Sequence, residues 1–440
     1  MGQCLKAETD QETPRMPDAS GPTIDTAELR LGLFVHLDLG WMDHPFPLGS
    51  FKITSQQQID TIRTLGLNRL RYSPDKSDPA PTTSGPSNPP LAAVSTPLNP
   101  EASERQRHKA LLQAQRQSLI QCERQFGEAA KAYRQVVEDL AQHPEAARER
   151  GLAVVHGVVD QMAGAGDSAI RLLSEGLGDR SSLHSVNVMV LSLLLGKAMG
   201  LSTSELQDLV VAALLHDVGK TALPERVRFR EDGLKPAQIK LYQEHVGHSL
   251  ALGKQLALNP RVLLAIAQHH EMADGSGFPL GIKADKIAPA SCILALINRY
   301  ENLCNPGSPA NALTPHESLS LIFAQMKERF DGNTLSAFIR MMGVYPPGSV
   351  VQLLDGRYAM VVSVNSTRPL KPRVVVHDSH IPRDEAPVLD LEHQRGVGIK
   401  RSVKPLQLPR ATLDYLSPRS RICYYFERAT DPTPHGGPAA

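Results

Sequence analysis

Two apolar helical runs near the middle of the chain each end in a pair of metal-binding residue types. The run "VVAALLHDVGK" ends with His216 and Asp217, and the run "LLAIAQHHE" ends with His269 and His270. A charged group at the end of a buried helix is costly unless a partner compensates it. A fold that buries these two helices therefore has to provide partners for the polar and charged side chains at their ends. A bound divalent cation is one such partner.

The residue types favour a centre with two metal ions. Adjacent residues on a helix point about 100° apart, so His216 and Asp217 could hold two metals, or one metal and a bridging water, from a single turn. A mixed imidazole and carboxylate shell suits Fe, Mn or Zn better than Mg or Ca. Two metals about 3.5 to 4 Å apart activate a hydroxide and clamp a phosphate. Phosphoester hydrolysis is the reaction that we expect from such a centre. The two pairs carry this expectation, because a single buried histidine such as His184 or His245 is, taken alone, more often a core residue.

Composition limits the classes of protein that remain. A length of 440 residues predicts two or three domains. The net charge of +1 argues against a general grip on a nucleic acid polymer or an anionic membrane. The five cysteines are scattered and never in CxxC spacing, which favours a reducing, cytoplasmic setting. The amino terminus lacks a signal-peptide pattern, and no apolar stretch reaches the ~20 residues of a membrane span.

The chain reads as a mainly α protein with three folded parts. Short alternation of aliphatic, aromatic and turn residues predicts a small α/β domain first, a train of apolar helices with little strand signal predicts an all-α bundle, and β-branched alternation with turn signals predicts a small β module last. A Pro/Ser-rich stretch cannot bury a core and reads as a linker. The expected parts are a disordered tail (1–27), the α/β domain (28–76), the linker (77–104), a long helix (105–150), the all-α domain (151–343), the β module (344–427) and a disordered tail (428–440).

A heptad pattern marks the expected long helix. Apolar residues recur seven apart at Leu112, Leu119, Phe126, Tyr133 and Leu140. Such a repeat favours a coiled-coil-like seam and therefore a homodimer. A long helix packed on its own domain explains the same pattern, and the sequence leaves the two readings open.

Several segments of the all-α region resemble the HD-GYP phosphodiesterases, a branch of the HD superfamily that hydrolyses the bacterial second messenger cyclic di-GMP. The matching segments occur in family order: "LHSVNV", "AALLHDVGK", "YQEHVGHS" and "HHEMADGSGFPLGI". The resemblance spans residues 180 to 343, and residues 28 to 76 look like the uncharacterised domain that often precedes this family.

The resemblance implies a helical bundle with two divalent ions, Fe or Mn, and a site assembled from matching residues. One ion would take His184, His216 and Asp217, and the other Asp217, His245, His269 and His270. Lys220 would face the substrate phosphate. The remaining implied positions are Glu271 and Asp274, which would orient the imidazoles and pin the glycine-rich turn, and Gly277, Phe278 and Pro279 in that turn. The implied product is linear pGpG, with further cleavage to GMP left open.

Three departures from the family pattern keep a second function open. Asn298 stands where the family has another metal-binding Asp, and as a ligand it would give the first ion one carbonyl oxygen without a charge. Phe278 replaces the Tyr of the GYP triplet, and "CNPGSPANALTP" replaces a segment with basic, phosphate-holding residues. Arg180 or Arg299 could partly replace those cations, although a surface role is simpler for each. The leading expectation is a cyclic di-GMP phosphodiesterase. The alternative is a catalytically degenerate domain that senses a ligand or binds a signalling protein through the "GSGFP" turn, and a hydrolase for another phosphoester is the third reading.

Overall fold

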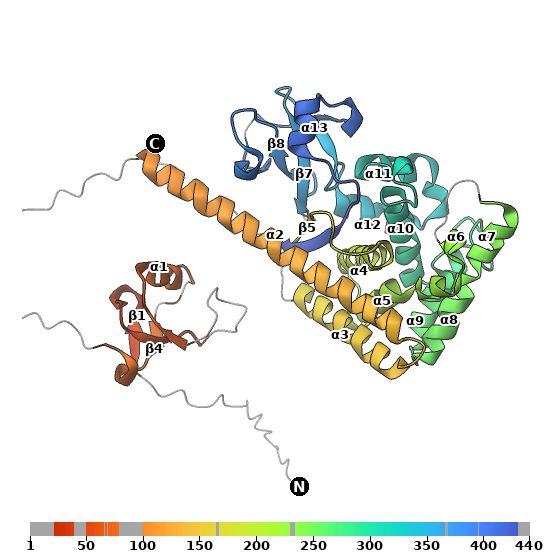
Figure 1. Ribbon diagram of the computed structural model, residues 1–440, viewed down its shortest axis with the longest axis horizontal. Helices are drawn as coiled ribbons and strands as arrows, with labels where there is room; N and C mark the ends of the chain where they lie inside the picture. Colours follow the sequence, from red (N-terminus) through yellow and green to blue (C-terminus); the bar gives the residue numbers. More distant parts are fainter. Residues whose placement is uncertain are drawn as a thin grey trace, which may run out of the picture. The chain divides into compact units, whose positions relative to one another are not determined.

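The computed structural model divides the chain into two compact units, Met1–Thr96 and Pro97–Ala440 (Figure 1). It describes residues 22–38, 50–65, 67, 69–78, 100–163, 167–228, 234–365, 368–394 and 396–429. Most of the expected linker and the carboxyl-terminal tail lie outside these residues, as does the first part of the amino-terminal tail.

The described residues of the first unit form a four-stranded antiparallel sheet with one α-helix, which confirms the expected small α/β domain. The strand order is β1-β4-β2-β3, and α1 packs Ile59 and Ile62 into the core of the sheet. Ser55 closes a capping box that fixes the start of α1. The elements are β1 (Thr23–Asp25), η1 (Thr26–Glu28), β2 (Phe34–His36), β3 (Ser50–Lys52), α1 (Gln56–Thr64), β4 (Arg69–Tyr72) and η2 (Pro74–Lys76). β1 lies inside the segment expected to be a disordered tail, so that boundary was placed too late; pairing with β4 holds this short strand.

The second unit begins with two helices where one long helix was expected. α2 (Pro100–Asp139) and α3 (Pro144–Ala163) are separated by a turn. Pro144 opens α3 because a proline fits the first turn of a helix and cannot continue a preceding one. The heptad residues Phe126 and Tyr133 are buried in the core of their own chain. Around these two residues, the apolar seam of α2 therefore packs against the helix's own chain. This agrees with the interpretation of a long helix packed on its own domain.

A bundle of helices around α4 forms the centre of the second unit. α4 (Arg180–Ala198) is buried along most of its length and packs against α2, α5, α10 and α12 (Figure 1). The other elements of this region are α5 (Thr203–Leu215), η3 (Val218–Ala222), α6 (Glu225–Arg228), α7 (Pro236–Gln243), α8 (His245–Gln255), α9 (Pro260–Gln268), η4 (Ala284–Lys286), α10 (Pro289–Cys304), η5 (Pro309–Asn311), α11 (Pro315–Gln325), η6 (Lys327–Arg329) and α12 (Gly332–Met342). Among the described residues, no helix is both long and apolar enough to cross a membrane.

Among the described residues, a seven-stranded antiparallel sheet, most of whose strands follow the bundle in the chain, confirms the expected β module. Its path is β10-β6-β7-β5-β11, with β8 joined to β7 and β9 to β8. The elements are β5 (Ser168–Leu172), β6 (Val350–Leu353), β7 (Tyr358–Asn365), β8 (Arg373–Val376), η7 (Arg383–Glu385), β9 (Val388–Asp390), β10 (Ile399–Ser402), η8 (Pro405–Gln407), α13 (Arg410–Leu416) and β11 (Tyr424–Arg428). β5 lies in the region expected to be all-α, and every one of its residues is buried. Since β5 pairs with both β7 and β11, the sheet is joined to the helical bundle and is not a separate appendage.

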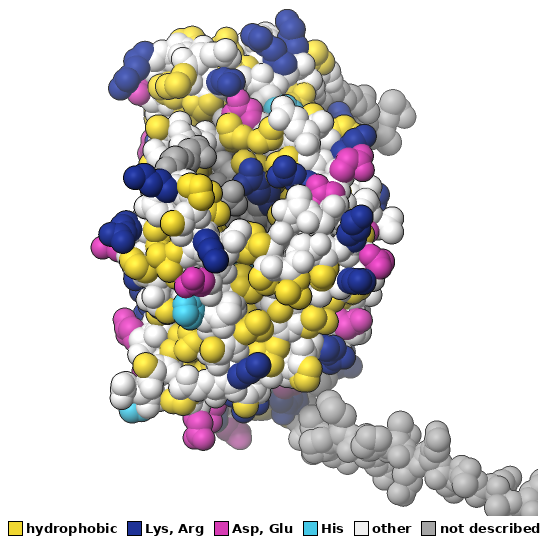
Figure 2. Space-filling view, turned by 90° about the vertical axis from the view of Figure 1, so that its right-hand side faces the viewer, with side chains coloured by type: hydrophobic (Ala, Val, Ile, Leu, Met, Phe, Trp, Pro, Cys, Tyr) yellow, Lys and Arg dark blue, Asp and Glu magenta, His cyan; other side chains and the backbone are white. Residues whose placement is uncertain are grey.

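The surface of the second unit carries both apolar and charged side chains. Figure 2 looks from the side on which α6 to α9 lie in Figure 1, and it shows Lys and Arg side chains gathered beside a hollow in that face.

Candidate metal centre

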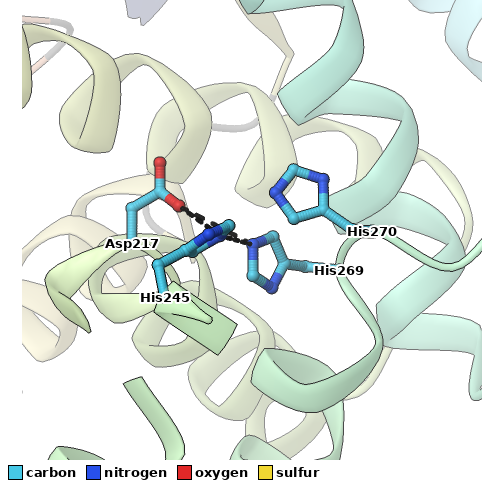
Figure 3. A group of neighbouring side chains, drawn as sticks. All are labelled: Asp217, His245, His269 and His270. Atoms are coloured by element: carbon cyan, nitrogen blue, oxygen red, sulfur yellow. Dashed lines mark hydrogen bonds and ion pairs between the residues drawn. The ribbon is translucent and has the colours of Figure 1, made fainter. Parts of the chain in front are cut away.

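The structure brings the predicted histidines and Asp217 together from four helices. They come from the second turn of α4, the end of α5, the start of α8 and the end of α9. Potential ligand atoms lie within 4.8 Å of one another in two groups: His184, His216 and Asp217 form one, and Asp217, His245, His269 and His270 form the other. Asp217 belongs to both groups, and Figure 3 shows the three imidazoles of the second group gathered beside its carboxylate.

Hydrogen bonds set the orientation of four of the imidazoles. The Nδ1 atoms of His216, His245 and His269 lie 2.8, 2.5 and 2.6 Å from the carbonyl oxygens of Ala213, Tyr242 and Ile266. Because a carbonyl oxygen can only accept, each Nδ1 donates and carries the proton. His184 donates its Nδ1–H to the Glu301 carboxylate. In each neutral ring the free lone pair is then on Nε2, which is the arrangement found in metal-ligating histidines.

The Nε2 atoms of these rings face one another across the centre. His184 and His216 approach to 3.2 Å and His245 and His269 to 3.3 Å through these atoms. Burial lowers the pKa of His216 to about 4 and that of His245 to about 3, so both rings are neutral near pH 7. For His184, burial also lowers the pKa, but the charges of Glu301 and Asp217 outweigh it and raise the pKa to about 9.

The donor set fits divalent cations. Within the part of the chain that the structure describes, the buried Oδ1 of Asp217 and Nε2 of His270 have no hydrogen-bond partner, although such atoms are normally satisfied. Oδ1 lies 3.4 Å from His245 Nε2 and 3.6 Å from His269 Nε2. Burial raises the pKa of Asp217, yet His216 and Lys220 outweigh this and hold it well below its usual range. An ionised carboxylate and several inward lone pairs therefore face one small region.

Gly219 allows this approach because it leaves no side chain between η3 and α8. A Cβ atom at this position would lie 2.3 Å from both the His245 carbonyl oxygen and the Ser249 amide nitrogen. The Gly219 N–H donates to Ser249 Oγ at 2.9 Å. The glycine of "HDVGK" thus holds Asp217 and Lys220 against the start of α8.

The glycine-rich turn after α9 is held mainly by Glu271. Its carboxylate accepts the amide N–H groups of Leu280 and Ile282 at 2.8 and 3.0 Å. Gly277 packs so tightly on the backbone that a Cβ would lie 2.4 Å from the Met272 amide nitrogen. The ring of Phe278 stacks on His270 with centroids 4.4 Å apart.

Glu271 and Asp274 were expected both to orient the imidazoles and to hold the glycine-rich turn, and the structure shows bonds of the second kind. Asp274 is exposed and accepts from the amide and hydroxyl of Ser276, and Glu271 bonds the turn. Pro279 is exposed at its end. Backbone carbonyls and Glu301 orient four of the imidazoles, and the role of Glu271 and Asp274 toward the imidazoles stays a prediction.

Glu301 is the residue that sequence reasoning missed. It is 3% exposed on α10, and its Oε1 accepts from Asn187 at 3.2 Å and from Asn305 at 2.8 Å while Oε2 holds His184. A carboxylate on the apolar face of "CILALINRYENLC" was the available signal, because such a group needs a partner when buried. Asn298, predicted as a ligand, is buried three residues earlier, and its Oδ1 accepts from Asn302 at 2.6 Å.

A cavity of about 250 Å³ opens beside the first group of ligands, with His184 and Asp217 in its wall. Ligand pockets usually enclose about 300–1,000 Å³, so a dinucleotide would extend beyond this one. The basic residues in its wall are Arg134, Arg180, Lys220, Arg228 and Arg421. Arg180 is therefore placed where it could serve as a replacement cation, whereas Arg299 does not line this cavity.

Comparison with known proteins agrees with this geometry. Residues 168–334 match the HD domain family, and residues 22–150 match a domain of unknown function, DUF3391. The chain carries an HD domain. The expected resemblance to the HD superfamily, preceded by an uncharacterised domain, is thereby confirmed. The DUF3391 match runs beyond the amino-terminal sheet and includes α2.

Several relatives of the HD domain are named as cyclic di-GMP phosphodiesterases. One from Pseudomonas aeruginosa is 26% identical over 361 residues, which cover 80% of this chain and 84% of that protein. The response regulator RpfG of Xanthomonas campestris is 30% identical over 149 residues, 33% of this chain and 39% of its own length. A solved HDG"Y"P protein from Bdellovibrio bacteriovorus aligns with 72% of this chain and 97% of its own, at 13% identity and a TM-score of 0.39.

Proposed function

We propose that this protein is a metal-dependent phosphodiesterase that hydrolyses cyclic di-GMP to linear pGpG in bacterial second-messenger signalling. The observation that carries the proposal is the pair of ligand groups that share Asp217, with inward-facing Nε2 lone pairs and two unpartnered polar atoms. The names of the relatives support the choice of substrate. Whether the product is cut further to GMP is a matter for product analysis.

The two groups would each hold one divalent ion, with Fe or Mn as the expected metals. The first ion would be held by His184, His216 and Asp217, and the second by Asp217, His245, His269 and His270. When bound, such ions supply Lewis acidity toward a phosphate and make water nucleophilic at neutral pH. We include Asn298 as a neutral oxygen donor to the first ion, in place of a carboxylate.

Lys220 supplies a positive charge beside the ligand groups. Its ammonium bonds Asp217 Oδ2 and lies 5.2 Å from the centroid of the Tyr242 ring. Burial lowers the pKa of Lys220, but Asp217 outweighs burial and raises it, so the amine keeps its proton. Because Lys220 also lines the cavity, its charge stabilises negative charge that develops on a phosphate bound there.

Hydrolysis by metal-loaded protein tests this proposal. The protein is purified without oxygen, loaded with Fe or Mn, and incubated with cyclic di-GMP while pGpG and GMP are separated by chromatography. We expect turnover by the parent and none by a variant with His216→Ala and Asp217→Ala. Turnover that survives in this variant would contradict the assigned mechanism.

A binding protein without catalysis is the second candidate, and Asn298 is the observation that favours it. Its amide oxygen is already bonded to Asn302, and residues 304–315 contain no Lys or Arg. Such a protein would bind the nucleotide, or a signalling partner at α2 or the 275–279 turn, without turnover. Nucleotide binding by metal-loaded, folded protein that yields no product would favour this candidate.

A further inference from the structure

We propose that Arg421, from the segment before β11, binds a phosphate of the dinucleotide substrate in place of the basic residues that residues 304–315 lack. The inference rests on the proposed function for the identity of the ligand. It adds that the carboxyl-terminal sheet forms part of the substrate site, and not only of the fold.

Strand pairing brings this segment to the cavity from far along the chain. β11 pairs with β5, with Tyr424 opposite Leu172, and the Leu173 N–H continues the ladder to the Cys423 carbonyl at 2.9 Å. β5 leads into α4, whose second turn carries His184. The residues just before β11 therefore lie beside the metal-ligand groups, and Arg421 lines the same cavity as His184 and Asp217.

Hydrogen bonds link the backbone next to this arginine with the metal centre. The carbonyl of Ile422 accepts from Asn187 at 2.8 Å and from Asn305 at 2.9 Å, and its N–H donates to Asn305 Oδ1 at 2.8 Å. The same two asparagines donate to Glu301, which holds the His184 imidazole. A site residue is most effective when its supporting shell fixes its position, and this network supplies such a shell.

Arg421 is one of the cations in the cavity wall that remain available for an anion. Arg134 pairs with Asp179, and Lys220 pairs with Asp217. Arg421 takes part in none of the ion pairs found among the described residues, and it is partly buried. A guanidinium in this position offers a planar fork of N–H donors that matches phosphate oxygens.

Substitution of Arg421 tests the inference by two readouts. The affinity of cyclic di-GMP for protein prepared without metal is measured by calorimetry, and KM and kcat are measured with the metal-loaded protein. We expect Arg421→Gln to weaken binding and raise KM about 10- to 100-fold, with kcat, bound metal and melting temperature little changed. Arg421→Lys should recover part of the affinity because it keeps the charge without the fork.

Arg410→Gln is the matched control. Arg410 lies on α13 in the same module, is 84% exposed and pairs with Asp414, so its loss should leave binding and KM unchanged. Parental affinity and KM in Arg421→Gln would overturn the inference while leaving the proposed function intact. Weakened binding by Arg421→Gln in a protein whose parent binds without turnover would support the inference and sink the proposed hydrolysis. A parent that neither binds nor hydrolyses the dinucleotide would contradict both.

Discussion

Replacement of Gly219 by alanine should disable the metal centre without touching a ligand. The new Cβ would sit 2.3 Å from two backbone atoms of α8, about 1 Å short of the 3.4 Å at which ordinary contact begins. Backbone cannot swing aside as a flexible side chain does, so η3 and α8 must separate by about 1 Å. Overpacking of this kind costs about 1–3 kcal/mol of the free energy of unfolding. Asp217 and Lys220 lie on the displaced segment, and a 1 Å misplacement costs about 100-fold in rate.

Gly247→Ala provides the matched control because it lies on α8 itself and a Cβ there would meet nothing within 4 Å. In a helix interior alanine is favoured over glycine by about 0.5–1 kcal/mol, so this variant should be at least as stable as the parent and fully active. Bound metal, thermal unfolding and hydrolysis of cyclic di-GMP are measured for both variants. Parental metal content and rate in Gly219→Ala would refute the packing argument.

Three further substitutions test separate parts of the account. Glu301→Gln keeps the shape but removes the charge beside His184, and loss of such a partner should weaken metal binding about 10- to 100-fold; unchanged affinity in a metal titration would show that the carboxylate is dispensable. Asn298→Asp should increase bound metal and the rate of hydrolysis if this position contributes to the first ion, and a fall in metal content would contradict that role. Phe126→Ala should lower the free energy of unfolding by about 3–5 kcal/mol at every protein concentration, whereas a loss that depends on concentration would indicate that the seam of α2 joins two chains.

The two pairs of metal-ligand candidates could be predicted from the sequence because each pair lies at the end of an apolar helical run. An apolar helix that ends in His216 and Asp217, and another that ends in two histidines, leave few alternatives to a shared polar centre. The structure places all of these side chains within one region. The role of Gly219 could not be read in the same way, since a glycine in a sequence does not reveal which backbone it approaches.

Features that depend on long-range pairing were missed. β5 is a five-residue strand with every residue buried, and a short apolar run of this kind cannot be told from a helix by periodicity. The place of Arg421 in the wall of the cavity depends on the pairing of β11 with β5. No local sequence pattern indicates this pairing. The heptad repeat of α2 predicted an apolar seam correctly, but the pattern is the same whether the seam faces another chain or its own domain.

The central claim is that Asp217 joins two metal sites in one catalytic centre, and counting bound metal tests it most directly. Protein purified without oxygen is saturated with Mn, freed of excess metal, and analysed for metal per chain beside Asp217→Ala, with circular dichroism to confirm that both are folded. We predict two ions per chain in the parent and a loss at both sites in the variant, because the carboxylate serves both. A folded parent that binds no metal, or a variant that retains two ions, would contradict the account.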